Sequence, residues 1–140
     1  MTEPLYTLDI LRLAAETDFA PLLAAPDATV ERRSPVCGSR ITVGVALDES
    51  GSVADYGHNV RACALGQASA TVLARHVKGR TINELATARD MLVAYLAGAD
   101  DSLPDWPGIE VLARARPYPA RHAAVRLPFE ALVDAVMEAQ

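Results

Sequence analysis

The chain has little of several residue types, and each scarcity narrows what it can be. Aromatic residues make up only 5% of its 140 residues, and it has only two cysteines, Cys37 and Cys63. No stretch approaches the about 18 uninterrupted apolar residues that a membrane-spanning helix needs. With a net charge of −5, the chain also lacks the basic footprint of a general nucleic-acid-binding protein.

Motifs for several enzyme classes are missing as well. The chain contains no phosphate-binding G-x-x-x-x-G-K-[ST] pattern and no H-E-x-x-H, and no Ser, His and Asp arrangement stands out. Its first residues, MTEPLYTLD, lack the basic region and apolar run of a secretory signal. We therefore expect a protein of the reducing cytoplasm, with no independent case for a hydrolase or a nucleotide enzyme. In that compartment two cysteines are free or metal-bound more often than they form a structural disulfide.

What the chain does contain is enough apolar residues for one folded domain over 1–140, because 51% of it is hydrophobic. Ile41, Val43 and Val45 alternate with polar or small residues, which predicts a strand over 40–47 with one buried face. The turn sequence DESGS follows and leads to a predicted strand over 53–60, and a further strand is possible over 28–33. These segments predict a small, three-stranded antiparallel sheet.

Helical spacing dominates the rest of the sequence. A short helix is predicted over 5–16, with Leu5, Leu8, Leu11 and Ala15 at helical spacing, and a second from Cys63 to Gly79. The pattern T-I-N-E at 81–84 predicts a capping box for a third helix, ending near Leu96. A last helix is predicted over 121–137, with a kink or a late start at Pro128. This order predicts an α+β fold with helices packed on one face of the sheet.

The two cysteines are expected at the same end of that sheet, because a hairpin separates them and returns the chain on itself. Cys63 opens a helix, where the unsatisfied N–H groups favour a thiolate over a thiol. Cys37 precedes Gly38, which would let the backbone approach whatever Cys37 binds. A metal site, a redox pair, a sulfur relay and two inert buried thiols all remain open at this point.

Two motifs around the cysteines resemble those of a known family. SPVCGSRI at 34–41 is similar to the P-x-C-G-D-[RV]-[IM] motif of the NifU/IscU-type iron–sulfur cluster assembly scaffolds, and RACALGQASA at 61–70 is similar to their second motif. The loop ADDSLPDWPG and the stretch IEVLARARPYPARHAAVRLPFEAL resemble the SufU-like branch. The resemblance covers about residues 30–135.

The resemblance implies a three-stranded α+β fold and a site that binds zinc or a transient Fe–S cluster through three cysteines and an aspartate. It also implies a cysteine desulfurase and other Fe–S assembly proteins as partners, and allows a homodimer. This chain departs from that pattern at two ligand positions: the aspartate is Ser39 and the third cysteine is Ala124. Cys37 and Cys63 remain as cluster or metal ligands, and His122 is a candidate third metal ligand.

Three functions are therefore carried forward. The first is a SufU/NifU-like scaffold or sulfur-transfer accessory with a degenerate metal site. The second is a non-catalytic relative that docks on a cysteine desulfurase and regulates it without metal, and the third is a thiol redox protein. Arg114, Arg116, Arg121 and Arg126 form a basic cluster that is either a solvated surface or a docking patch for an acidic partner.

Overall fold

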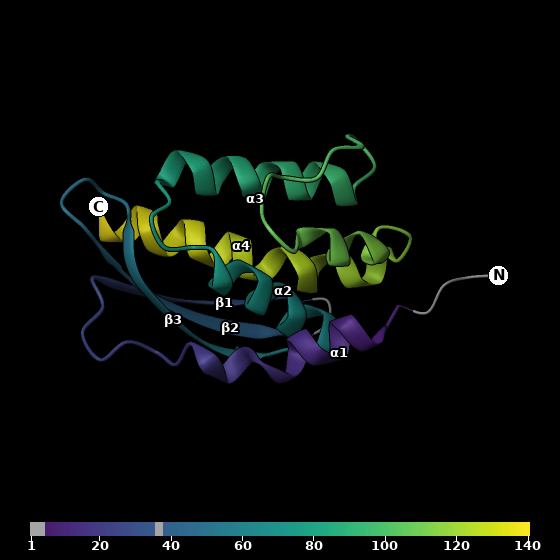
Figure 1. Ribbon diagram of the computed structural model, residues 1–140, viewed down its shortest axis with the longest axis horizontal. Helices are drawn as coiled ribbons and strands as arrows, with labels where there is room; N and C mark the ends of the chain where they lie inside the picture. The colour runs from purple at the N-terminus through teal and green to yellow at the C-terminus, as the bar shows by residue number, and fades with distance from the viewer. Residues whose placement is uncertain (1–4, 36–37) are drawn as a thin grey trace.

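The computed structural model describes residues 5–35 and 38–140 as one sheet with helices packed against it (Figure 1). In chain order the elements are α1 (Leu8–Ala15), the 3-10 turn η1 (Thr17–Phe19), β1 (Ala28–Arg33), β2 (Arg40–Leu47), β3 (Val53–Arg61), α2 (Ala64–Arg75), α3 (Ile82–Leu96), the 3-10 segment η2 (Ile109–Ala115) and α4 (Pro119–Ala139). None of the helices among these residues has the length and apolarity to cross a membrane.

The sheet is antiparallel, with strand order β1-β2-β3, as the alternation predicted. Ile41, Val43 and Val45 are almost fully buried and form the inner face of β2. The first two strands have the predicted bounds, and the third runs one residue further than predicted, to Arg61.

The helices lie on the inner face of the sheet in two layers (Figure 1). α4 packs on β1 and β2, α2 packs against α4 and α1, and α3 covers the side of α4 away from the sheet. Phe129 and Leu132 of α4 are buried between these layers, together with Leu65 and Leu73 of α2. This arrangement confirms the predicted α+β fold with helices on one face.

The outer face of the sheet is covered at one end by the chain segment between η1 and β1. A Cβ atom on Gly57 would lie 2.1 Å from the carbonyl oxygen of Pro21, so only glycine allows this crossing. The backbone N–H of His58 donates to the carbonyl of Ala20 at 2.8 Å and holds the segment along the edge of β3. No helix or strand within residues 5–35 and 38–140 covers the other end of this face.

The capping-box prediction for α3 is confirmed. The Thr81 hydroxyl accepts a hydrogen bond from the Glu84 N–H, and the Glu84 carboxylate accepts one from the Thr81 N–H, both at 3.3 Å. These bonds satisfy two of the free N–H groups at the helix start and fix the register of α3.

Three helix predictions need correction. The first helix buries Ile10 and Ala14, whereas Leu8 and Leu11 point to solvent with exposed fractions of 61% and 48%. α2 ends at Arg75 and not at Gly79, because the following residues turn to meet the start of β3: the Gly79 N–H donates to the Val53 carbonyl.

α4 passes through Pro128 without a break, so the late start that Pro128 suggested is wrong. The proline removes one N–H and leaves the carbonyl of Ala124 without its helical donor. The buried hydroxyl of Ser69 donates to the next carbonyl, that of Val125, at 2.7 Å. Packing of α4 between the sheet and α3 supplies the remaining stability.

Candidate functional site

The candidate site lies at the end of the sheet where β1 and β3 finish and β2 begins. The strand register places Arg33 opposite Arg40 and Arg40 opposite Arg61, so these three chain positions share one row. The tip between β1 and β2 is closed by a hydrogen bond of 2.8 Å from the Ser34 N–H to the Ser39 carbonyl. α4 also begins at this end, because Gln140, the residue that follows its last turn, lies against Gly51 at the opposite end of the sheet.

Cys63 stands at this end as the residue that opens α2. Its backbone is extended, with φ −62° and ψ 167°, and its carbonyl accepts from the Gln67 N–H at 2.9 Å. Its side chain does not accept a hydrogen bond from the first N–H groups of α2, as a serine or aspartate at this position would. The thiol is free and half-buried and packs against the core. The prediction that Cys63 opens a helix is confirmed.

Cys37 lies outside the described residues. The distance between its sulfur atom and that of Cys63, on which the redox alternative depends, is therefore not described either. Its neighbour Gly38 has φ +72°, a conformation that favours glycine. No described residue lies within 4 Å of a Cβ atom placed there, so the backbone conformation is by itself enough to favour glycine at this position.

Ser39 and Ala124 occupy the two positions where the resemblance implies an aspartate and a third cysteine. Ser39 is 3% exposed and continues the inner face of β2, two residues before Ile41. Ala124 is 1% exposed and lies on α4 against the first turn of α2, where a Cβ on Gly66 would be 3.5 Å from the Ala124 Cβ. Both positions are therefore buried, and neither carries an ionisable group.

Ser34 adds an unusual feature to this end of the sheet. Its hydroxyl is buried and has no hydrogen-bond partner among the residues described. An unpaired buried hydroxyl costs free energy unless something satisfies it. Sequence reasoning missed this residue, although it directly precedes Pro35 in the first motif.

His122, the candidate third ligand, uses one ring nitrogen elsewhere. Its Nε2 lies 3.0 Å from the carbonyl oxygen of Ala115 and 2.9 Å from that of Arg116. Because carbonyls only accept, Nε2 carries the proton and donates to both, and only Nδ1 is left for a metal. These bonds tie the start of α4 to the end of η2.

The basic cluster near the start of α4 is partly neutralised within the chain. Arg116 donates to a carboxylate oxygen of Asp101 at 2.8 Å and lies over the Tyr95 ring, and its pKa is raised mainly by that hydrogen bond. Arg126 lies 3.9 Å from the carboxylate of Glu130. These contacts favour the solvated-surface interpretation for those two arginines.

A complete metal site does not fit the described part of the chain. No group of three His, Cys, Asp or Glu side chains that could bind a metal occurs within residues 5–35 and 38–140. Of the four ligand positions implied by the resemblance, Cys63 carries a thiol, Ser39 only a hydroxyl and Ala124 only a methyl group, and Cys37 is not described. A closed zinc site takes four protein ligands, and Fe–S clusters take four thiolates.

A three-stranded antiparallel sheet backed by helices, with a thiol where a strand meets a helix, defines a small α+β protein. The family model for the NifU-like N-terminal domain matches residues 6–107. The chain thus belongs to the NifU-like N-terminal domain family, the scaffold family of iron–sulfur cluster assembly that its cysteine motifs resemble.

Solved structures agree with this assignment. The N-terminal part of a nitrogen-fixing NifU-like protein from Brucella abortus is 37% identical, with a TM-score of 0.89 over 96% of this chain and 94% of that one. A putative iron–sulfur cluster assembly scaffold protein of the SUF system from Fervidobacterium islandicum AW-1 is 22% identical, with a TM-score of 0.83 over 94% and 96% of the two chains. It shares the fold. No curated protein matches the chain.

Proposed function

We propose that this chain is a cytoplasmic iron–sulfur cluster assembly factor with an open thiol site. Cys37 and Cys63 supply its ligands, and groups from outside the chain complete the coordination of zinc or of a transient Fe–S cluster. The observation that carries this proposal is the burial of Ala124 against Gly66, which fills the third cysteine position with a methyl group. Family membership supports the assembly role.

Ligand chemistry argues for outside groups. Two thiolates hold zinc weakly, and an Fe–S cluster needs about four. A second copy of the chain supplies two more thiols, and a partner such as a cysteine desulfurase supplies a thiol of its own. His122 adds a third ligand from this chain only through Nδ1, because its Nε2–H donates to two carbonyls.

The test is elemental analysis of protein purified without air, for zinc, iron and acid-labile sulfide. We expect substoichiometric metal that rises on reconstitution and is lost in Cys37→Ser and in Cys63→Ser. Ser102→Ala, at an exposed serine outside the two cysteine motifs, serves as the control and should retain metal. Wild-type protein that holds neither metal nor cluster after anaerobic reconstitution would contradict the proposal.

A gain-of-ligand variant makes the test sharper. Ser39→Asp combined with Ala124→Cys restores the four ligand types of the family. If Cys37, Cys63 and the two restored positions surround one point, this variant should bind one zinc per chain at least about a hundredfold more tightly than wild type. His122→Ala in the wild-type background shows whether Nδ1 contributes.

A second candidate is docking on a cysteine desulfurase without metal, and the side chains at Ser39 and Ala124 favour it. It predicts that wild type and the Cys37→Ser/Cys63→Ser variant are both free of metal and bind the desulfurase equally. Calorimetry with purified desulfurase separates the two candidates, because the open thiol site requires the cysteines and docking alone does not.

A further inference from the structure

We propose that Arg33, Arg40 and Arg61, here called the arginine row, form a docking surface for an acidic segment of a partner protein. This inference rests on the proposed function and deepens it, because it states which kind of segment, an acidic one, the partner at the thiol site carries. The basic cluster of Arg114, Arg116, Arg121 and Arg126 lies on and next to η2 and α4 and is not part of the arginine row.

The arginine row is fixed by the strand register. Arg33 of β1 lies directly opposite Arg40 of β2, and Arg40 lies directly opposite Arg61 of β3. Directly opposite residues point to the same face of an antiparallel pair, so all three side chains project from the outer face. Neighbouring strands are about 4.8 Å apart, so the three arginine positions span about 10 Å.

Little charge within the chain offsets this row. The carboxylate of Glu31 accepts a hydrogen bond from Arg33 at 2.7 Å, and its pKa is lowered first by that bond and also by the charge of Arg40. In the parts of the chain that the structure describes, no ion pair to Arg61 is found. On the inner face, by contrast, Arg32 contacts two acids, Asp134 at 2.6 Å and Glu130 at 3.7 Å.

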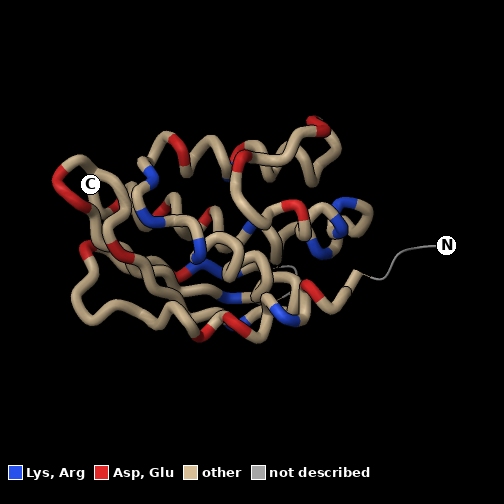
Figure 2. Tube along the Cα trace, in the orientation of Figure 1, with Lys and Arg blue, Asp and Glu red and all other residues tan. Residues whose placement is uncertain are grey.

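The charges of the sheet are segregated by position. Asp27, Asp48 and Asp55 lie at the opposite end, and Figure 2 shows acidic residues in the loop beside the C-terminus as well as on other parts of the molecule. The chain as a whole carries −5, so the row is a local feature of an acidic protein. Like charges directly opposite each other destabilise a sheet, so the row does not serve stability.

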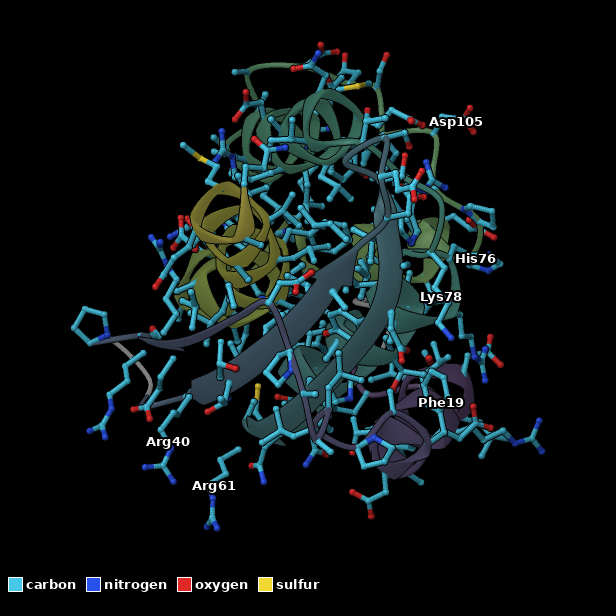
Figure 3. All side chains as sticks on the ribbon, turned by 90° about the vertical axis from the view of Figure 1, so that its left-hand side faces the viewer. Phe19, Arg40, Arg61, His76, Lys78 and Asp105 are labelled. Carbon is cyan, nitrogen blue, oxygen red and sulfur yellow. The ribbon has the colours of Figure 1, made fainter. Side chains whose placement is uncertain are left out.

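The row is open to a partner. The segment that crosses the outer face covers it near Gly44 and Gly57, away from the row. The Arg33 side chain is 68% exposed, and Arg61 is exposed. Figure 3 shows Arg40 and Arg61 beside each other at the edge of the molecule, with their guanidinium groups projecting into solvent.

The row also adjoins the candidate site. Arg40 directly follows Ser39, and Arg61 lies two residues before Cys63. A segment with two or three carboxylates matches three guanidinium groups within about 10 Å, and each pair can form two parallel hydrogen bonds. A partner held this way lies at the end of the sheet where Cys63 opens α2. A nucleic acid or a membrane would need a broader basic surface than three residues.

The experiment measures binding of a short fluorescein-labelled peptide of aspartate and glutamate, with the matching asparagine and glutamine peptide as the neutral control. We expect the acidic peptide alone to bind, more weakly at high salt, and to shift the NMR amide signals of Thr42 and Asn59 in the next row. The Arg33→Gln/Arg40→Gln/Arg61→Gln variant should bind the acidic peptide at least about tenfold more weakly than wild type does.

A matched variant removes equal charge elsewhere: Arg12→Gln on α1, Lys78→Gln beyond α2 and Arg89→Gln on α3. It should bind as wild type does. The proposal is overturned if wild type does not bind the acidic peptide, if both triple variants weaken binding equally, or if single-stranded DNA or phosphatidylserine vesicles bind more tightly than the peptide.

The cysteine variant keeps this test independent of the proposed function. Cys63→Ser should bind the acidic peptide as tightly as wild type, even though it loses metal. Loss of peptide binding in the arginine variant with unchanged metal content supports the row as a docking surface. Unchanged peptide binding in that variant contradicts the docking proposal and does not affect the proposed thiol site.

Discussion

Gly66 of α2 and Ala124 of α4 contact each other across the two helices. A Cβ atom built on Gly66 would lie 3.5 Å from the Ala124 Cβ and 3.4 Å from the Ala124 carbonyl oxygen. That carbonyl is the one that Pro128 leaves without a helical donor. The position where the family resemblance implies a third thiol is thus a helix–helix packing contact in this chain.

Gly66→Ala should destabilise the protein despite the higher helix propensity of alanine. The new methyl group would lie 2.8 Å from the Ala62 Cβ, a clash that only a backbone shift relieves. Overpacking of this kind costs about 1–3 kcal/mol, against a propensity gain of about 1 kcal/mol. We expect a net loss of up to about 2 kcal/mol in the free energy of unfolding, measured by urea denaturation.

Gln67→Ala, one residue further along α2, is the control for helix propensity and should change stability by less than about 0.5 kcal/mol. A Gly66→Ala variant that is as stable as wild type or more stable would show that the chain at Ala62 shifts easily to admit the new methyl group. It would then contradict the view that Gly66 lies in a tightly packed contact.

Ser69→Ala tests how α4 tolerates its internal proline. The Ser69 hydroxyl donates to the Val125 carbonyl at 2.7 Å, next to the carbonyl that Pro128 leaves unpaired, and Ser69 is fully buried. Losing this bond should lower the free energy of unfolding by about 1 kcal/mol. Differential scanning calorimetry against Ser102→Ala, an exposed serine, measures the effect. Equal stability of the two variants would assign no role to the bond.

The regular elements could be predicted because their signals are local. The alternation of Ile41, Val43 and Val45 identifies a strand without knowledge of the rest of the fold. The reciprocal bonds between Thr81 and Glu84 join residues three apart, so the sequence pattern alone predicts them.

Features that depend on distant residues could not be predicted in this way. α4 continues through Pro128 with a hydrogen bond from Ser69, a partner 56 residues from Val125. The core face of α1 was misjudged because Leu8 and Leu11 have the spacing of a buried stripe, yet the helix turns Ile10 towards α2.

The candidate site was predictable in its parts and not as a whole. Cys63 at a helix start follows from the change of hydrophobic period, and its position near the β1–β2 tip follows from the hairpin. The contact of Gly66 with Ala124 depends on how two helices cross, which no local pattern encodes. The hydrogen bonds of His122 likewise depend on the path of η2.

Stability should fall as the pH drops below about 6.5, through His58. Thr17 offers only a carbonyl oxygen at 2.8 Å, so His58 Nε2 carries the proton, and its Nδ1 accepts from the Tyr56 hydroxyl at 2.8 Å. Burial lowers the pKa of His58 from its usual 6.5. The unfolded chain therefore binds a proton at a pH where the folded chain does not.

This contribution is complete above about pH 6.5 and is lost as the pH falls from there towards the lowered pKa of the folded state. The slope reaches at most about 1.4 kcal/mol per pH unit. Urea unfolding at several pH values measures it. His58→Gln should remove this part of the slope, and His76→Gln, at an exposed histidine, controls for the loss of a histidine as such. An unchanged slope in His58→Gln would refute the assignment.

Arg40→Glu should stabilise the fold, because Arg40 lies between two like charges, Arg33 and Arg61. The substitution replaces two repulsive cross-strand pairs with two attractive ones, worth about 0.5–1 kcal/mol together, and the lost attraction between Arg40 and Glu31 offsets part of this gain. Arg40→Gln only removes the repulsion and should gain about half as much. High salt should shrink both gains, since the side chains are in contact with solvent. Guanidinium chloride is itself a salt, so urea is the denaturant of choice. If Arg40→Glu is less stable than wild type at low salt, the three arginines do not repel one another, and the argument that the row is maintained for binding loses its basis.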